Sequence, residues 1–341
     1  MAQTRKWRLP LDGYSLALLA AVGVAVVLPV RGATAAGLSW VTTAAIALLF
    51  FLHGARLSRQ TVIAGATHWR LHLLVFGCTF VLFPALGLLV HGLPATVLGP
   101  SLATGFLFLT LLPSTVQSSI AFTSMASGNV TAAVCTAAAS NLVGTLLTPA
   151  LVAVFMGVQG HGGDTGAVIR SISLQLLVPF LAGQAVQPWA GAWISRHRIL
   201  VTMTDRGSIL LVVYGAFSAA IVHGLFSQVA WTQLATVFLF ALVLLAAVIG
   251  TALFLGRRLG FSRADQMTIL FCGSTKSLAS GVPMAGVLFP AATVGVVILP
   301  LMIFHQVQLL VCAQLARHYA TRGAAAGGQD AVAREPLETT S

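Results

Sequence analysis

Long apolar segments recur along the whole chain, and short runs rich in glycine, proline or charge separate them. Each segment has about 20 residues, the length that a helix needs to cross a hydrocarbon layer about 30 Å thick. The segments do not alternate between polar and apolar residues, as the strands of a membrane barrel do. The pattern therefore predicts an all-α polytopic membrane protein. Its ten spans are expected at 13–30, 38–56, 70–91, 100–126, 129–157, 167–188, 205–223, 231–256, 265–288 and 291–316.

The composition agrees with a lipid bilayer as the surrounding partner. Hydrophobic residues make up 57% of the chain, charged residues 7%, and the mean hydropathy is +0.94. The net charge of +11 does not indicate nucleic acid, because the basic residues form small groups between apolar segments rather than one patch. The four cysteines lie in apolar segments without metal-ligand spacing. We therefore expect no metal, no cofactor and no nucleic-acid partner.

The distribution of arginine and lysine predicts how the chain is oriented. With a cytoplasmic amino terminus, the two residues Arg31 and Arg170 fall on the far side, and Lys276 lies inside a span. The remaining fifteen fall on the cytoplasmic side: Arg5, Lys6, Arg8, Arg56, Arg59, Arg70, Arg196, Arg198, Arg206, Arg257, Arg258, Arg263, Arg317, Arg322 and Arg334. This asymmetry predicts a plasma (bacterial inner) membrane protein with both termini cytoplasmic. The first span also resembles a signal peptide, but a retained first helix keeps the charge map consistent.

Two related stretches indicate an internal repeat. "LLPSTVQSSIAFTSM" (111–125) and "LFCGSTKSLASGVPM" (270–284) align Ser114 with Ser274 at an offset of 160 residues. Each half then has five spans, and an odd number gives the halves inverted topology. The expected organisation is an amino-terminal arm (1–12), a first repeat (13–160), a second repeat (161–320) and a disordered tail (321–341).

Both stretches contain residues that interrupt helices. Pro113 removes a backbone donor, and Gly273 lowers the cost of leaving helical geometry; Gly281 and Pro283 follow closely. Unwound backbone at membrane depth persists only where protein buries it or water lines it. Simple kinks are one interpretation, but breaks at matching positions of inverted halves are typical of a secondary transporter's binding site. The side chains expected there are Ser114, Thr115, Gln117, Ser118, Ser119, Ser274, Thr275 and Ser277.

At these residues the chain resembles the bile acid:sodium symporter family, and most of all its sodium/bile acid cotransporter 7-like branch and bacterial relatives. The resemblance covers about 12 to 318 and rests on "SGNVTAA" (127–133), "LLTPAL" (146–151), "FCGSTKSLASGVPM" (271–284) and "FHQVQLL" (304–310). It implies panel and core subdomains, with the broken fourth and ninth helices crossing in the core. It also implies alternating access and transport of small or amphipathic organic anions.

One departure from the family pattern concerns sodium. The family's sodium-coupled members carry a glutamate before the crossover in helix nine, and here Phe271 stands in that place. A hard cation prefers oxygen ligands, usually including a carboxylate. All seven acids are expected at span ends, in loops or in the tail: Asp12, Asp164, Asp205, Asp265, Asp330, Glu335 and Glu338. The typical sodium site therefore is expected to be absent.

Lys276 is the most informative single residue, because it is expected near the middle of the ninth span. A charged lysine at that depth costs about 2.5–3.5 kcal/mol on insertion scales, and such residues usually mark function. Its ammonium could attract a substrate anion, or it could take the place of the missing cation and bind carbonyls at the crossover. We prefer the second interpretation, and the two are compatible.

Weaker candidates are His305 and Gln306 in the tenth span, and Asn141, which we expect to bond the freed backbone of segment four. His53 and His223 are expected at the interface. The sequence favours a secondary transporter of a small organic anion rather than an enzyme. The alternatives are a channel-like facilitator, and an intramembrane hydrolase in which Ser274 or Ser118 pairs with Lys276.

Overall fold

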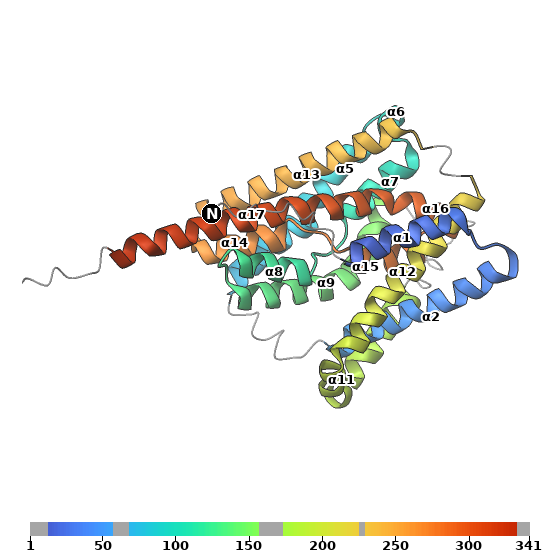
Figure 1. Cartoon of the computed structure of the whole chain (residues 1–341), viewed down its shortest axis with the longest axis horizontal. Helices are drawn as coiled ribbons and strands as arrows, with labels where there is room; N and C mark the ends of the chain where they lie inside the picture. The colour runs from blue at the N-terminus through green and yellow to red at the C-terminus, as the bar shows by residue number, and fades with distance from the viewer. Residues whose placement is uncertain (1–12, 57–67, 157–172, 225–228, 333–341) are drawn as a thin grey trace, which may run out of the picture.

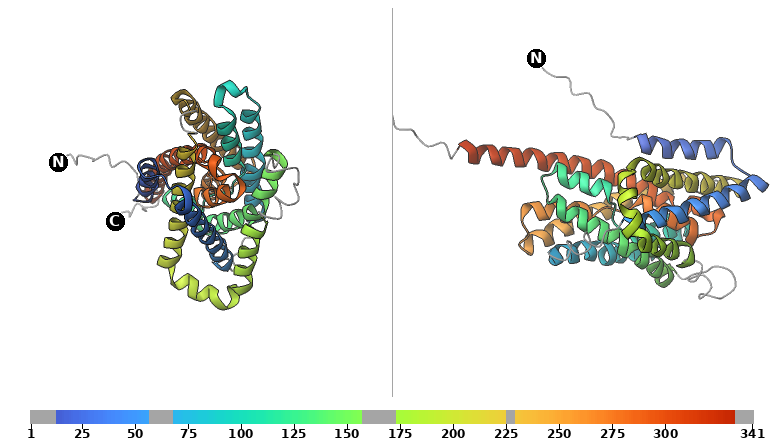
Figure 2. Two further views of the ribbon diagram at one scale, coloured as in Figure 1. Left: turned by 90° about the vertical axis from the view of Figure 1, so that its right-hand side faces the viewer. Right: turned by 90° about the horizontal axis from the view of Figure 1, so that it is seen from below.

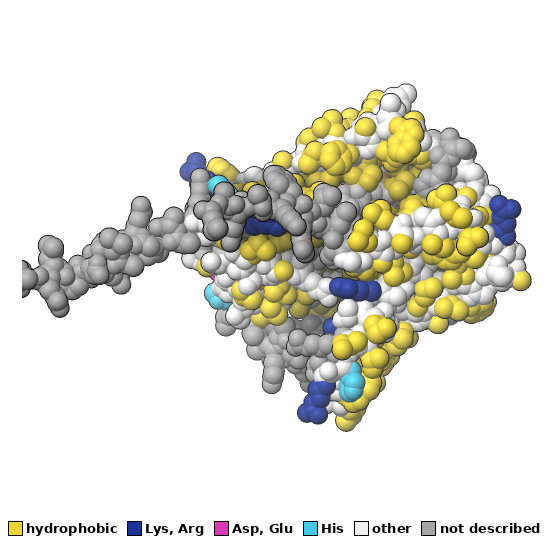
Figure 3. Space-filling view, in the orientation of Figure 1, with side chains coloured by type: hydrophobic (Ala, Val, Ile, Leu, Met, Phe, Trp, Pro, Cys, Tyr) yellow, Lys and Arg dark blue, Asp and Glu magenta, His cyan; other side chains and the backbone are white. Residues whose placement is uncertain are grey.

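The computed structural model describes residues 13–56, 68–156, 173–224 and 229–332 (Figure 1). Within these ranges the chain forms helices and connecting turns, with no β-strand. Hydrophobic side chains cover much of the visible face, and basic side chains appear there as isolated groups (Figure 3). Six helices are long and apolar enough to cross a membrane: 32–56, 69–91, 130–156, 199–222, 231–258 and 291–321. The prediction of an all-α multi-pass membrane protein is confirmed.

Four helices pack together on one side of the molecule, and we call them the four-helix group (Figure 1). α2 packs along both α11 and α12, while α1 packs on α12. A turn of π-helix, η3, precedes α11. Their bounds are α1 Gly13–Val27, α2 Gly32–Arg56, η3 Ser173–Leu177, α11 Val178–Arg196 and α12 Arg198–Val222.

Glycines allow α2 and α11 to approach each other closely. A Cβ added at Gly183 would clash with the carbonyl oxygen of Phe51, and one added at Gly54 would clash with the carbonyl oxygen of Phe180. Because each glycine faces the backbone of the opposite helix, the contact is reciprocal. Small residues at such crossings let membrane helices pack through their backbones.

The remaining helices form a second unit, which we call the crossover group. α14 packs on α4, α8, α9 and α13, and α17 packs on α7, α8 and α13. The bounds are α4 Trp69–Gly77, η2 Cys78–Leu82, α5 Phe83–His91, α6 Ala95–Leu98, α7 Pro100–Thr110, α8 Gln117–Met125, α9 Val130–Met156, α13 Trp231–Arg258, α14 Arg263–Gly273, α15 Leu278–Leu288, α16 Ala291–Val297 and α17 Leu299–Val332. The two groups meet where α12 contacts α15 and α16.

Two spans are interrupted. The first break separates α7 from α8 and contains Pro113, and the second separates α14 from α15 directly after Gly273. Gly281 and Pro283, which we expected to be breaks, lie inside α15 instead. The reason is a cap: the hydroxyl of Ser277 accepts a hydrogen bond from the N–H of Ser280 at 3.1 Å, so α15 begins before them.

Two further boundaries differ from the predictions. α12 begins at Arg198 rather than near 205, so Asp205 lies inside a helix. α17 continues to Val332, into the range predicted to be a disordered tail, and extends past the rest of the molecule (Figure 2). The three alanines at 324–326 favour this continuation by their helix propensity, whereas the glycines at 323, 327 and 328 oppose it. Residues 1–12 and 333–341 lie outside the described residues.

The contact between α2 and α11 predicts the effect of filling it. Gly183→Ala should destabilise the protein by about 1–3 kcal/mol, because the added methyl group meets a backbone carbonyl that cannot rotate away. Thermal unfolding in detergent measures the loss. Gly250→Ala in α13 is the matched control, because a Cβ there meets nothing within 4 Å. Equal melting temperatures for the two variants would show that the close approach does not matter.

Candidate functional site

The two breaks meet and satisfy each other's backbone groups. The N–H of Ser277 donates to the carbonyl of Pro113 at 2.9 Å. The hydroxyl of Ser114 donates to the carbonyl of Cys272 at 2.6 Å and lies 3.1 Å from the hydroxyl of Thr275. Helix ends leave backbone donors and acceptors unpaired, and lipid offers no partners for them. The serines and threonines at the crossover therefore supply the partners that the interrupted helices lack.

Neighbouring helices extend this network. The hydroxyl of Ser119 donates to the carbonyl of Phe271 at 3.1 Å, and that of Thr148 donates to the carbonyl of Leu111 at 2.8 Å. The N–H of Ser114 donates to the hydroxyl of Ser140 at 3.1 Å.

Asn141 was expected to bond the freed backbone of segment four, but its neighbour Ser140 does so. Asn141 is one residue further along α9, so its side chain lies on a different face of the helix. The Asn141 side chain instead accepts a hydrogen bond from the Ser280 hydroxyl at 2.8 Å.

Lys276 is fully buried, and three backbone carbonyls surround its ammonium. Nζ lies 2.8 Å from the oxygen of Thr79, 2.8 Å from that of Thr110 and 2.6 Å from that of Leu112. It also lies 4.2 Å from the centre of the Phe83 ring. An ammonium has three N–H donors, and here each has a carbonyl acceptor. The ring face adds a favourable cation–π contact.

The local structure explains why these carbonyls are free. Thr110 ends α7 and Leu112 follows it, so their oxygens are at the negative end of a helix. Thr79 lies in the π-helical turn η2, where the N–H of Phe83 bonds back to the carbonyl of Cys78. In this register the next nitrogen is that of Pro84, which has no hydrogen. The carbonyl of Thr79 therefore keeps no helical donor and can accept from Lys276.

Gln308 holds the backbone of Lys276 on the other side. Its side-chain oxygen accepts from the Lys276 N–H at 2.8 Å, and its side-chain nitrogen donates to the Lys276 carbonyl at 2.9 Å. Gln306, the glutamine that we had selected, is partly exposed and does not line the cavity described next. The available signal was the helical spacing, since Gln308 follows His305 by three residues and shares its face. The side-chain nitrogen of Gln308 lies 3.0 Å from Nδ1 of His305.

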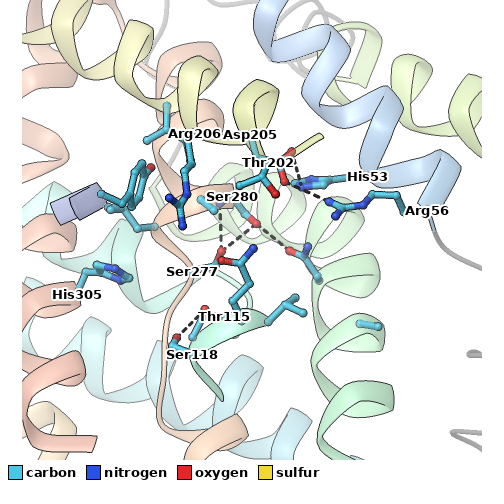
Figure 4. A pocket seen from close by; sticks show the side chains of 18 of the residues that line it. His53, Arg56, Thr115, Ser118, Thr202, Asp205, Arg206, Ser277, Ser280 and His305 are labelled. Carbon is cyan, nitrogen blue, oxygen red and sulfur yellow. Dashed lines mark hydrogen bonds and ion pairs between the residues drawn. The ribbon is translucent and has the colours of Figure 1, made fainter. Parts of the chain in front are cut away.

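A cavity of about 530 Å³ lies between the two helix groups (Figure 4). The crossover group contributes a wall of hydroxyl, amide and imidazole side chains. On this wall the hydroxyl oxygens of Thr115 and Ser118 are 3.0 Å apart, and those of Ser277 and Ser280 are 3.1 Å apart. The predicted site residues on the wall are Thr115, Gln117, Ser118, Asn141, Ser277 and His305.

The opposite wall carries charge and comes from α1, α2 and α12. Arg56 donates to the carboxylate of Asp205 at 3.1 Å, and His53 lies 3.8 Å from the same carboxylate. The guanidinium of Arg206 lies 5.1 Å from the centre of the Tyr14 ring. Asp205 and His53 were expected at a span end and at the interface, and both in fact line this cavity. Asp205 was misplaced because the predicted span began at 205, seven residues after the observed start of α12 at Arg198.

The other predicted site residues belong to the crossover rather than to the cavity. Ser114, Ser119 and Thr275 bond one another and the helix ends, and Ser274 donates to the carbonyl of Leu270 at 2.6 Å. Lys276 is also absent from the cavity wall. In the part of the chain that the structure describes, no three His, Cys, Asp or Glu side chains are placed to hold a metal ion.

Crossed, interrupted helices beside a polar cavity in a multi-pass helical protein are the features of a secondary transporter. The chain belongs to the SBF-like CPA transporter family, whose profile matches residues 12–321.

Several relatives are similar over most of their length. The chain is 55% identical to "Uncharacterized protein PA2026" of Pseudomonas aeruginosa over 91% of this chain and 93% of that one. It is 53% identical to "Putative symporter YfeH" of Escherichia coli over the same shares. It is 26% identical to mouse "Sodium/bile acid cotransporter 7" over 88% of this chain and 90% of that one.

The contacts of Lys276 predict the effect of removing its charge. Lys276→Met should lower the stability of the protein without any ligand, because each buried acceptor left unpaired costs about 1–3 kcal/mol. The gain from no longer burying a charge offsets part of this loss. Lys276→Arg should also be destabilised, since a planar guanidinium cannot replace a compact ammonium among three converging carbonyls.

Thermal unfolding of the purified protein checks this prediction. Arg31→Met, which removes an exposed positive charge, is the control. If Lys276 served only to attract an anion, Lys276→Met would melt like the wild type and lose only anion-dependent stabilisation.

Proposed function

We propose that the protein is a secondary transporter of a small organic anion that works by alternating access without bound sodium. The observation that carries this proposal is the cavity between the two helix groups, which has the crossover on one wall and arginines on the other. Ligand sites of such transporters lie at the junction of two structural units with broken helices. The positive wall favours an anion, and the family membership favours transport over other functions.

The packing supports movement of one group against the other. The crossover group is tied together by hydrogen bonds between its backbone and hydroxyl groups, so it can move as a body. Its contact with α12 uses small and apolar residues, with Gly286 against Val212 and Gly295 against Ala216. A smooth apolar contact can slide without breaking hydrogen bonds. Rigid-body motion of one unit against another is the common form of alternating access.

In this proposal, Lys276 takes the place of a coupling cation at the crossover. Its ammonium contacts three carbonyl oxygens, the ligand type that a hard cation would use. A covalently attached charge cannot dissociate, so the crossover would stay assembled through the whole cycle. The carboxylate that lines the cavity, Asp205, is already paired with Arg56.

The proposed arrangement in the membrane has ten spans in two inverted repeats and both termini in the cytoplasm. Helical segments lie in all ten predicted ranges, although among the described residues six helices meet the length and hydropathy criteria for a span. Arg56 ends α2, and the distribution of arginine and lysine assigns it to the predicted cytoplasmic side. A cavity that reaches this residue would then face the cytoplasm.

A Ser–Lys hydrolase is the rival function from another class. A lysine that activates a serine must have a lone pair directed at the hydroxyl. All three donors of Lys276 instead have carbonyl partners, and the hydroxyls of Ser118 and Ser274 pair with Thr115 and with the Leu270 carbonyl. Labelling by a serine-reactive phosphonate would favour the hydrolase. Conductance with many ions per opening would favour a channel.

Transport should not require sodium. Uptake of a transported anion by proteoliposomes should be unchanged when choline replaces sodium at constant pH, because Lys276 already supplies a positive charge at the crossover. A steep and saturable dependence on sodium would contradict the proposal and would require a site built of neutral oxygens.

The topology can be tested separately. Reporter domains fused after Gly260 and after Thr321 should read cytoplasmic, and one fused after Gly224 should read external. These positions follow α13, lie within α17 and follow α12, respectively. An external signal at either of the first two positions would remove the inverted repeat.

A further inference from the structure

The cavity contains more positive than negative groups, and their pairing is specific. Arg56 is bound to Asp205, with 3.1 Å between nitrogen and oxygen, and the carboxylate side chain is 15% exposed. Arg206 is exposed, and among the described residues no carboxylate lies within ion-pair distance of it. Its guanidinium is directed into the cavity, toward the side on which Ser277 and His305 lie (Figure 4).

The formal charges of the cavity can be counted from these groups. The titratable and charged side chains that line it are those of Tyr14, His53, Arg56, Asp205, Arg206 and His305. With neutral imidazoles and a neutral phenol, the two arginines and one aspartate leave one positive charge. That charge belongs to Arg206, because the other arginine is neutralised by its partner.

We infer that Asp205 sets the charge selectivity of the site: by neutralising Arg56, it leaves Arg206 as a single positive charge that binds a singly charged anion. This inference rests on the proposed function, because it specifies the substrate of the same cavity. Arg206 would hold a carboxylate or sulfonate by two parallel N–H donors. The hydroxyls and amides of the opposite wall, among them Ser277 and Asn141, are suited to uncharged polar groups of the same molecule.

A second anionic group on the ligand would meet the Asp205 carboxylate. Like charges repel in a partly buried site, and Arg56 is already paired with Asp205, so a dianion should bind more weakly than a monoanion of the same length. Removing Asp205 should reverse this preference, because Arg56 then becomes free to bind the second group. The selectivity therefore depends on a residue that itself carries the same sign of charge as the substrate.

The experiment measures binding by thermal shift and by titration calorimetry at pH 8, above the ordinary pKa of a free imidazole. The probes are hexanoate, octanoate and decanoate, each beside the dicarboxylate with the same number of carbons, and octanamide as the neutral control. The wild type should prefer a monocarboxylate. Asp205→Asn should change the ratio of dicarboxylate to monocarboxylate affinity by about tenfold or more in favour of the dicarboxylate.

Three further variants test charge rather than one contact. Either single arginine substitution leaves the cavity with no net charge. Arg206→Gln should lose anion binding, because it also removes the group that holds the anion, and Arg56→Gln should weaken it. The double variant Asp205→Asn with Arg56→Gln should restore the monocarboxylate preference. Arg70→Gln, which lies on a separate groove beside Trp69 and Phe261, is the control and should bind like the wild type.

Each result decides for or against the inference. An unchanged preference in Asp205→Asn, binding that survives Arg206→Gln, or no carboxylate binding by the wild type would overturn it. Binding with the predicted charge rule but without uptake by proteoliposomes would contradict the transport function and leave the charge rule intact.

Discussion

The structure depends on how two interrupted helices keep their backbone groups paired at membrane depth. Each break leaves carbonyls and N–H groups that lipid cannot satisfy. Here the partners come from within the protein: hydroxyls of Ser114, Ser119 and Thr275 on one side of the crossing, and the ammonium of Lys276 on the other. The lysine is the strongest of these partners, because one charged group pairs with carbonyls from two different spans.

Several unrelated residues are needed to bury that lysine. The π-helical turn η2 and Pro84 free the carbonyl of Thr79, and the end of α7 supplies the other two acceptors. Gln308 pairs with both backbone groups of Lys276 and so fixes where its side chain begins. A lysine without this complete set would be costly, since an unpaired charge in hydrocarbon loses its hydration with no replacement.

This arrangement separates two tasks that one positive charge could have combined. Lys276 lies within the crossover and does not line the cavity, whereas Arg206 lines the cavity from the four-helix group. In the proposed function, stability and ligand recognition would therefore be assigned to different helices. The anion would be held from the side that does not contain the crossover, while hydroxyls and amides of the crossover group would contact the rest of the ligand.

The sequence by itself determined the class of protein, because hydrophobic length and charge placement follow directly from the bilayer. It also located the two breaks at Pro113 and Gly273, and it singled out Lys276, because prolines, glycines and charges are rare and costly inside apolar spans. Hydrogen-bond partners were harder to predict, since a shift of one or two residues on a helix changes the face. Ser140 makes the contact that we had expected of Asn141, and Gln308, which we had not selected, pairs with the backbone of Lys276. Tertiary structure alone decided that Asp205 and Arg56 meet, because they are 149 residues apart and their pairing depends on how α2 packs against α12.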